Sequence, residues 1–405
     1  YDDYAGVDVR GKIVVTLHGA PASFPSTERA YYADGLVKGA NAVAHGAVGL
    51  LTMLSPDEMR RYPWAWIMPQ IHSGSLRWLD DKGNPHDVFP ELRAGGLLSK
   101  SGTEALFAGA SKTLDQVFAA ANASRPQAFA LAASAKIHTV SQHTTVESDN
   151  IVGVLRGSDP ALRGQYVVYT AHVDHLGRCP AVDGDNICHG AFDNASGVAA
   201  LLEVARAFTR LPHPPRRSVL FVFVTGEEKG LLGSDYFANY PTVPKQAMVA
   251  NVNIDSAPGL LYPLKDVVPL GIEHSSLSTD VQQAAKIMGY QISPDPMPEE
   301  VFFIRSDQYS FVRQGVPAVD VTDGLQSSDP KLDGGNILKT WMTTLYHTPK
   351  DNMNQPFYYD SAAKCARLNF LIGYDVAEQK QPPSWNRGDF FAQKFANARS
   401  AEAGK

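Results

Sequence analysis

Residues 166–197, YVVYTAHVDHLGRCPAVDGDNICHGAFDNASG, decide the fold of this chain. The stretch opens with the apolar, β-rich run 166–171, which predicts a strand. His172 and Asp174 follow at the carboxyl end of that strand, and Asp193 begins a turn into a predicted helix. These three side chains fall within about two dozen residues, which is a close spacing for metal ligands.

Two more apolar runs end at acidic residues. Residues 218–225 are followed by Glu227 and Glu228, and residues 248–254 are followed by Asp255. Strands that alternate with helical patterns predict an α/β fold with a mostly parallel central sheet flanked by helices. In such sheets ligands bind beyond the carboxyl ends of the strands. The sequence therefore predicts that these acidic residues meet His172 at one edge of the sheet.

Five side chains qualify as ligands of a metal site, namely His172, Asp193, Glu228, Asp255 and His347. Imidazole nitrogens and carboxylate oxygens suit zinc. Five ligands are too many for one tetrahedral zinc with an open position, but they fit two ions if one carboxylate bridges them. Asp193 is the expected bridge because both of its oxygens can face the ions from a helix-starting turn. We therefore expect two Zn²⁺ ions as cofactors.

Neighbours of these ligands have expected roles as well. Adjacent Glu227 and Glu228 cannot do the same work, so one should bind metal and the other should act as general base. Asp174 is expected to hold the second N–H of the His172 imidazole and so to orient its ring.

Length and composition narrow the classes of protein. A chain of 405 residues is long enough for two domains. Acidic residues outnumber basic ones by 42 to 36, which argues against a nucleic-acid partner. No apolar run reaches the roughly 18 residues that a membrane helix needs. The chain starts at Tyr1 without a Met, so we expect that a leader or pro-segment was removed.

Changes in pattern predict three parts: a first domain over 1–135, a catalytic domain over 136–378 and a polar, irregular tail over 379–405. Residues 136–140 read as a strand, and 56–90 read as an irregular segment. The scattered histidines of the first part lack partners at ligand spacing, so we expect them to be structural or solvated.

The three cysteines are Cys179, Cys188 and Cys365. Cys179 and Cys188 flank a short polar loop within the central stretch, where either a disulfide or two free thiols would fit. A disulfide would imply an oxidising compartment. Cys365 lies on a helical pattern and is expected to be buried. The absence of any C-x-x-C spacing argues against a zinc-finger site.

The site residues lie in runs that resemble the M28 zinc peptidases, namely 171–177, 190–197, 225–234, 253–255 and 346–349. The resemblance extends over residues 145–375. It implies one zinc on His172 and Asp255, another on Glu228 and His347, with Asp193 as the bridge. It also implies that Glu227 is the general base and that Tyr346 supports the oxyanion.

Two runs in the first part, 8–15 and 39–49, resemble a protease-associated (PA) domain, which implies a smaller β-rich domain beside the catalytic one. In the M28 family the catalytic domain usually begins before this insert. We therefore expect an N-terminal piece to be missing before Tyr1 or to exist as a separate chain.

These observations predict a dinuclear zinc exopeptidase that acts on peptides, and an aminopeptidase is the first hypothesis. The alternatives are a zinc carboxypeptidase, a glutaminyl cyclase and a non-catalytic receptor-like module of the same fold. A carboxypeptidase would need a cation for the terminal carboxylate, and Arg305 and Arg313 are the nearest candidates. Asp307 and Gln308 are further candidates for substrate binding, and Gln308 stands where the family often has His. The family and a Cys179–Cys188 disulfide would both favour a secreted or periplasmic protein.

Overall fold

A computed structural model describes residues 2–72, 74–125, 128–395 and 398. The contacts among these residues divide the chain into two units. Unit 1 combines Tyr1–Val146 with Met297–Ile304, and unit 2 combines Glu147–Pro296 with Arg305–Lys405. The N-terminal unit thus extends beyond residue 135 and also takes a segment from within the expected catalytic domain.

Unit 1 contains a three-stranded parallel sheet in the order β1-β2-β3. Its strands are β1 (Ile13–Leu17), β2 (Gly49–Met53) and β3 (Ala94–Leu98). Its helices are α1 (Ser26–Ala33), α2 (Gly35–Ala44), α3 (Pro56–Arg61), α4 (Trp64–His72), α5 (Lys100–Phe107) and α6 (Leu114–Asn122). Helices make up most of its regular structure, whereas we expected a β-rich unit. The assignment as a PA domain stays a prediction.

The segment 56–90 is less irregular than expected, because it contains α3 and α4. The start of α3 is fixed by a capping box: the Ser55 hydroxyl accepts from the backbone N–H of Glu58, and the Glu58 carboxylate accepts from the N–H of Ser55. These bonds satisfy amide groups that a free helix end would leave unpaired. This local pattern was readable in the sequence but was masked by the surrounding Pro and Trp residues.

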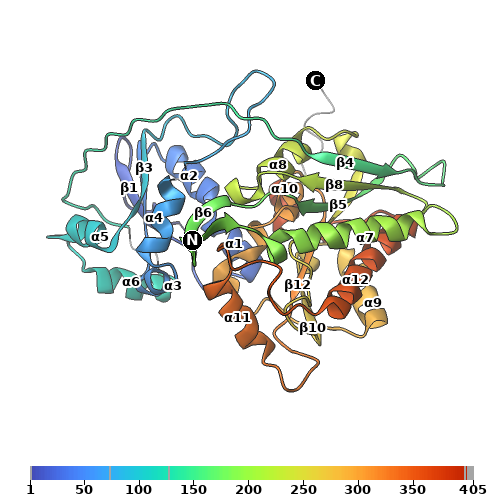
Figure 1. Cartoon of the computed structure of the whole chain (residues 1–405). Coiled ribbons are helices and arrows are strands. Elements are labelled where there is room, and N and C mark those ends of the chain that lie inside the picture. Colours follow the sequence, from blue (N-terminus) through green and yellow to red (C-terminus); the bar gives the residue numbers. More distant parts are fainter. Residues whose placement is uncertain (1, 73, 126–127, 396–397, 399–405) are drawn as a thin grey trace. The chain divides into compact units, whose positions relative to one another are not determined.

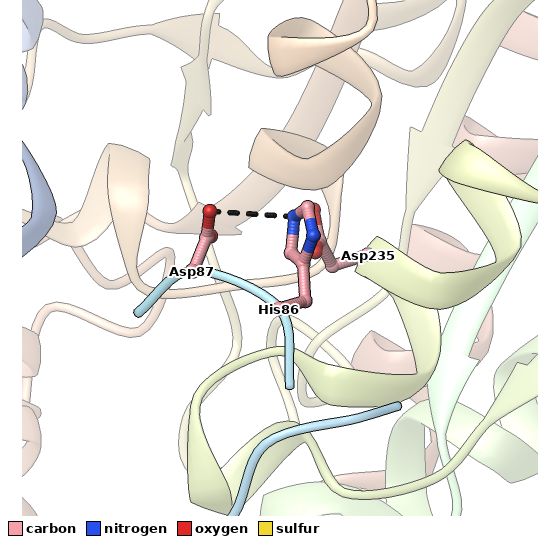
Figure 2. Close-up of side chains that lie close together, drawn as sticks. All are labelled: His86, Asp87 and Asp235. Carbon is pink, nitrogen blue, oxygen red and sulfur yellow. Dashed lines mark ion pairs between the residues drawn. The ribbon is translucent and has the colours of Figure 1, made fainter. Parts of the chain in front are cut away.

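Two histidines of unit 1 have an acidic neighbour. His18 Nδ1 lies 2.7 Å from Glu58 Oε1, and His86 Nε2 lies 3.3 Å from Asp87 Oδ1 (Figure 2). The His86 ring also stacks on Trp78, with 4.0 Å between the ring centroids.

The segment Met297–Ile304 is held within unit 1 by Glu300. Its carboxylate, which is buried, accepts hydrogen bonds from Arg61 at 2.7 Å and from the Tyr62 hydroxyl at 2.5 Å. Phe303 in the same segment is also buried. Hydrogen bonds to Arg61 and Tyr62 at the end of α3, together with contacts to α1, therefore fasten this segment within unit 1.

Unit 2 is built on a seven-stranded sheet in the order β11-β10-β12-β9-β5-β8-β4. The strands are β4 (Ile151–Leu155), β5 (Tyr166–His172), β8 (Ser218–Val224), β9 (Met248–Asn253), β10 (Asp266–Leu270), β11 (Gln291–Ile292) and β12 (Ala318–Asp323). Only the β4–β8 and β10–β12 pairs are antiparallel, so the prediction of a mostly parallel sheet is confirmed. Residues 136–140, which we expected to form a strand, belong to no strand and are exposed.

Helices cover both faces of this sheet (Figure 1). One face carries α7 (Gly197–Thr209), α9 (Leu277–Met288) and α12 (Tyr359–Glu378), and the other carries α8 (Leu232–Asn239) and α10 (Gln308–Arg313). Strands β5 and β8 are buried along almost their whole length. Burial on both faces explains why these strands read as unbroken apolar runs.

The C-terminal end of α12 is closed by Arg217, whose side chain is fully buried. Its guanidinium donates to the carbonyl oxygens of Val376 at 2.9 Å, Gln379 at 2.5 Å and Lys380 at 3.2 Å. A cation at this position satisfies carbonyls that the helix leaves unpaired and complements the helix dipole.

The described part of the tail, residues 379–395 and 398, is more ordered than expected, and the prediction for 396–397 and 399–405 lies outside the described residues. The described part contains α13 (Phe390–Phe395), and Asp389 lies 2.7 Å from Nδ1 of His274 in unit 2. The ring of buried Phe391 meets His274 edge to face. Among the described residues, no helix combines the length and the apolar character needed to cross a bilayer.

Candidate metal centre

Strand ends of the unit 2 sheet deliver most of the candidate ligands. His172 is the last residue of β5, and Asp255 comes two residues after β9. After β8 the chain turns at Gly226, whose φ of 68° lies in the left-handed region that favours glycine. This turn places Glu227 and Glu228 beyond the carboxyl end of β8. The arrangement is the one expected for a parallel sheet.

Two further ligands come from loops. Asp193 lies in the irregular turn η1 (Ala191–Ser196) that leads into α7. His347 follows α11 (Gly334–Thr344) and has a φ of 58°, which is uncommon for a residue other than glycine. A backbone in this region is a mark of functional sites when its surroundings hold it.

All five expected ligands converge. Nε2 of His172 lies 3.2 Å from Asp193 Oδ1 and 3.4 Å from Asp255 Oδ1. Nε2 of His347 lies 3.4 Å from Asp193 Oδ2 and 3.0 Å from Glu228 Oε2. Asp193 therefore presents one oxygen to each histidine, which is the geometry that a bridging carboxylate requires.

The spacing of these atoms fits zinc. Ligands at about 2.0–2.1 Å from a tetrahedral zinc lie roughly 3.3 Å from one another, close to the separations of the Nε2 atoms of His172 and His347 from their carboxylates. Both Nε2 atoms are buried and have no hydrogen-bond partner among the described residues. Nδ1 of His172 lies 3.1 Å from the Asp174 carbonyl, so it carries the proton and leaves Nε2 free to bind metal.

Asp174 differs from its expected role. We expected its carboxylate to hold His172, but Oδ1 lies 3.8 Å from Nδ1, and the backbone carbonyl is the nearer acceptor. The Asp174 carboxylate instead accepts a hydrogen bond from the backbone N–H of Glu227 at 3.2 Å. Asp174 thus orients His172 through its main chain and Glu227 through its side chain.

The electrostatics of the cluster favour bound cations. Burial opposes a charge on His347, yet the nearby carboxylates of Asp193 and Glu228 raise its pKa to about 9. Burial likewise opposes a charge on His172. The carboxylates of Asp255 and Asp193 outweigh this effect and raise the pKa of His172. So many carboxylates in a buried place are stable only when positive charge compensates them.

Glu227 is set apart from the other carboxylates. Burial raises its pKa well above the usual range for a glutamate, and the carboxylate charges of Asp255 and Asp307 act in the same direction. A carboxylate with a raised pKa holds an abstracted proton better and suits a general base.

Tyr346 and Arg305 form one edge of the site. The Tyr346 ring stacks on His347, with 3.7 Å between the ring centroids. The Arg305 guanidinium donates to the Tyr346 hydroxyl at 3.3 Å. Arg313, the other candidate cation, instead contacts Asp235 at 3.4 Å.

The substrate-binding candidates Asp307 and Gln308 lie in the interior of unit 2. Both side chains are fully buried, and Gln308 Oε1 accepts a hydrogen bond from Asn253 at 3.2 Å. Burial also raises the pKa of Asp307 to about 7. These residues begin α10 and lie behind the site, a position that the sequence run alone did not reveal.

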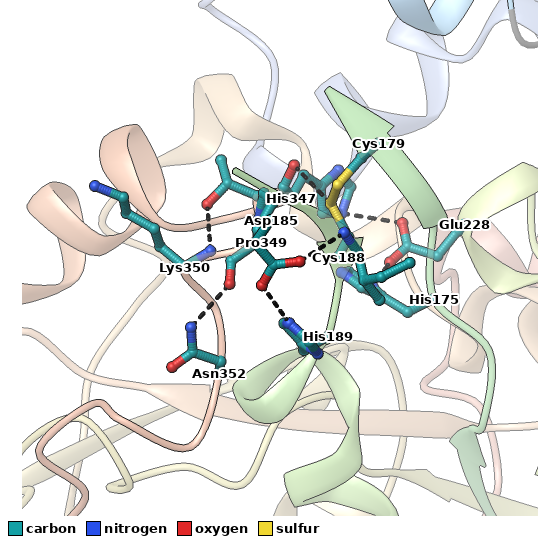
Figure 3. The surroundings of a disulfide bond; sticks show 12 residues. His175, Cys179, Asp185, Cys188, His189, Glu228, His347, Pro349, Lys350 and Asn352 are labelled. Atoms are coloured by element: carbon teal, nitrogen blue, oxygen red, sulfur yellow. Dashed lines mark hydrogen bonds and ion pairs between the residues drawn. A yellow bond between two sulfur atoms is a disulfide. The ribbon is translucent and has the colours of Figure 1, made fainter. Parts of the chain in front are cut away.

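Two residues at the site were missed from the sequence. His175 Nδ1 lies 2.6 Å from Glu228 Oε1 (Figure 3). The buried carboxylate of Asp351 accepts from the backbone N–H groups of Phe192 and Asp193. His175 lies three residues after His172 and Asp351 four residues after His347, and only this proximity in sequence could have drawn attention to them.

The question of the paired cysteines is settled by a disulfide between Cys179 and Cys188 (Figure 3). It joins β6 (Gly177–Val182) to β7 (Asp185–Cys188), which form an antiparallel hairpin. Cys188 Sγ lies 3.4 Å from the backbone oxygen of His347. The disulfide therefore fastens the hairpin beside one of the candidate ligands. Cys365 is a buried free thiol, as expected.

Comparisons with known proteins identify the family. A sequence model of peptidase family M28 matches residues 150–372, and the chain belongs to this family. A probable leucine aminopeptidase 2 of Aspergillus fumigatus is 27% identical over 213 residues, which cover 50% of this chain and 39% of the relative. A probable zinc metalloprotease of Pyrenophora tritici-repentis is 34% identical over 110 residues, which cover 27% of this chain and 24% of the relative.

A solved structure, the aminopeptidase from Aneurinibacillus sp. strain AM-1, aligns with 93% of this chain and 72% of its own, with a TM-score of 0.49 and 18% identity. The chain spans less than half the length of the curated relatives named above.

Proposed function

We propose that this protein is a dinuclear zinc exopeptidase that removes N-terminal residues from peptides. The observation that carries the proposal is the position of Asp193, with one oxygen 3.2 Å from His172 Nε2 and the other 3.4 Å from His347 Nε2. On this reading His172, Asp193 and Asp255 would hold one zinc, and Asp193, Glu228 and His347 would hold the other. The names of the zinc metalloprotease and aminopeptidase relatives support the same choice.

When bound, zinc would polarise the scissile carbonyl and make water more acidic. The chain's own residues would do the rest. Glu227 would take a proton from the attacking water while the water oxygen bonds to the carbonyl carbon. Glu227 would then pass this proton to the leaving amine as the C–N bond breaks. The Tyr346 hydroxyl would donate to the oxyanion that forms on the carbonyl oxygen. Arg305, which contacts that hydroxyl, would fix its direction.

A carboxypeptidase is the second candidate, because Arg305 places a cation beside Tyr346. A guanidinium is well suited to bind the terminal carboxylate of a peptide. Free aminoacyl substrates, N-blocked substrates and substrates with an amidated C-terminus separate the two reactions. Cleavage that requires a free amino group supports the aminopeptidase, and cleavage that requires a free carboxylate supports the alternative. Cyclisation of N-terminal glutamine would point to a glutaminyl cyclase.

The direct test combines metal analysis with one variant. Elemental analysis should find two zinc ions per chain in the purified protein. Glu227→Gln should retain that zinc and lower kcat by about 10²–10⁴-fold, because a general base is lost. Glu203→Gln, an exposed site on α7, is the matched control and should behave as the wild type. A protein without zinc and without peptide turnover would instead be a receptor-like module.

We further propose that the protein works outside the reducing cytosol, in a secreted or periplasmic setting. The Cys179–Cys188 disulfide supports this, since such bonds persist in oxidising compartments.

A further inference from the structure

The two oxygens of Glu228 have different partners. Oε1 accepts from His175 Nδ1 at 2.6 Å, and Oε2 lies 3.0 Å from His347 Nε2 (Figure 3). Side chains of both His175 and Glu228 are less than one-tenth exposed. The hydrogen bond is therefore shielded from water and restricts the rotation of the carboxylate.

The distance between His175 and Glu228 indicates that His175 is a hydrogen-bond donor and not a metal ligand. His175, Asp193 and Glu228 are close enough together to surround an ion. However, two ligands of one tetrahedral zinc lie roughly 3.3 Å apart, and 2.6 Å is instead the length of a short hydrogen bond to a carboxylate. His347, at 3.0 Å from Glu228 and 3.4 Å from Asp193, has the spacing of a ligand.

Close packing keeps the His175 ring in place. Gly190 has a φ of 64°, and a Cβ atom at that position would lie 2.8 Å from Cγ of His175. The ring also meets His347 edge to face, with 5.6 Å between the ring centroids. The absence of a side chain at Gly190 therefore makes room for His175 against the metal centre.

Adjacent residues of the loop after β5 engage the two glutamates in order. Asp174 accepts the backbone N–H of Glu227, and His175 donates to the side chain of Glu228. Building on the zinc centre of the proposed function, we propose that His175 is a positioning residue that makes Glu228 the metal ligand. By holding Oε1 it leaves a single oxygen, Oε2, for the ion, and so leaves Glu227 free to move protons.

Two substitutions distinguish this role from packing. In His175→Asn the amide nitrogen takes the place of Nδ1, so the donor is kept and the ring is lost. In His175→Phe the ring is kept and the donor is lost. The readouts are the affinity of each zinc, measured by competition with a chelator, the kcat and KM of peptide cleavage, and the melting temperature of the metal-free protein.

We expect His175→Asn to retain both zinc affinities and most of kcat. The second zinc is the ion that Asp193, Glu228 and His347 would hold. His175→Phe should lower the affinity for this ion by about 10–100-fold, the usual cost of losing a hydrogen bond to a metal ligand. His175→Gln, which places its amide near the position of Nε2 rather than Nδ1, should resemble His175→Phe. It also serves as the donor-misplaced variant if the phenylalanine variant does not fold.

The reverse order, with zinc held by His175→Phe and lost by His175→Asn, would show that the ring acts by packing and would overturn the proposal. Loss of the second zinc in all three variants would show that His175 is itself a ligand, which also overturns it. Failure of the proposed function has a different signature, because the wild-type protein would then bind no zinc at all.

Discussion

The carboxylate of Asp351 accepts hydrogen bonds from the backbone N–H groups of Phe192 and Asp193. Its Oδ1 accepts from the Phe192 N–H at 2.9 Å, and its Oδ2 accepts from the Asp193 N–H at 3.1 Å. The Asp351 carbonyl also accepts from Ala191 at 3.1 Å. The loop that carries His347 therefore determines where the expected bridging carboxylate lies, and one buried side chain would couple the two proposed metal positions.

Asp351→Asn should weaken zinc binding by about 10–100-fold, because the amide offers one acceptor oxygen and directs its NH₂ toward a backbone N–H. We expect kcat to fall with it, since Asp193 would no longer face both histidines. Zinc affinity by chelator competition and peptide turnover measure the two effects. Asp360→Asn, an exposed position at the start of α12, is the control. Wild-type zinc affinity in Asp351→Asn would exclude this positioning role.

Removal of the disulfide should loosen the β6–β7 hairpin. The bond closes a sequence separation of 9 residues, which corresponds to about 2–3 kcal/mol of lost chain entropy in the unfolded state. Because Cys188 touches the His347 backbone, the double variant Cys179→Ser, Cys188→Ser should bind zinc less tightly and melt at a lower temperature. A mild reductant should reproduce this change in the wild type and leave the double variant unaffected. A wild type that keeps its zinc after reduction would contradict the prediction.

Arg217→Lys should lower the free energy of unfolding of unit 2 by about 1.5–3 kcal/mol, because one ammonium cannot reach all the carbonyls that the guanidinium serves inside the protein. Arg206→Lys on α7 is the control. Arg206 forms an exposed ion pair with Glu203, and such a pair is worth about 0–1 kcal/mol. Denaturant unfolding followed by tryptophan fluorescence measures both. Equal losses in the two variants would show that the helix end does not depend on the buried cation.

Acidification should stabilise the contact between α9 and α12. Burial, and then the charge of Asp375, raise the pKa of Asp280 to about 6. The folded protein therefore binds this proton more tightly than the unfolded chain does. The resulting stability is fully present below about pH 4, the ordinary range of an aspartate, and is lost as the pH rises through about 6.

A shift of this size corresponds to about 2–3 kcal/mol. Asp280→Asn cannot titrate, so its melting temperature should vary less between pH 4 and pH 7 than that of the wild type. The comparison uses metal-free protein, so that loss of zinc in acid does not enter. Parallel curves for the two proteins would show that Asp280 ionises normally.

The convergence of the candidate ligands was predictable in part, because His172, Glu228 and Asp255 each follow a strand end. The apolar run before His172 and the run before Glu227 indicated where the chain would reach the sheet edge. His175 was not predictable in the same way, because its partner Glu228 lies 53 residues away and the pairing depends on how the loops close over the sheet.

The burial of Asp307 and Gln308 could not be seen in the sequence. A polar run beside a catalytic motif reads as exposed, but here it begins a short helix whose first residues point into the interior. In unit 1 the segment 56–90 read as irregular, and helices α3 and α4 within it were missed although Ser55 offers a capping box.

The assignment of Met297–Ile304 to unit 1 determines how the catalytic part could be produced alone. A gene that starts at residue 147 would still encode Glu300 and Phe303, now deprived of the unit 1 residues that surround them. Such a protein would expose an orphaned carboxylate and an aromatic side chain, and we expect it to aggregate. A short glycine–serine bridge in place of this segment is the appropriate design for an isolated peptidase unit.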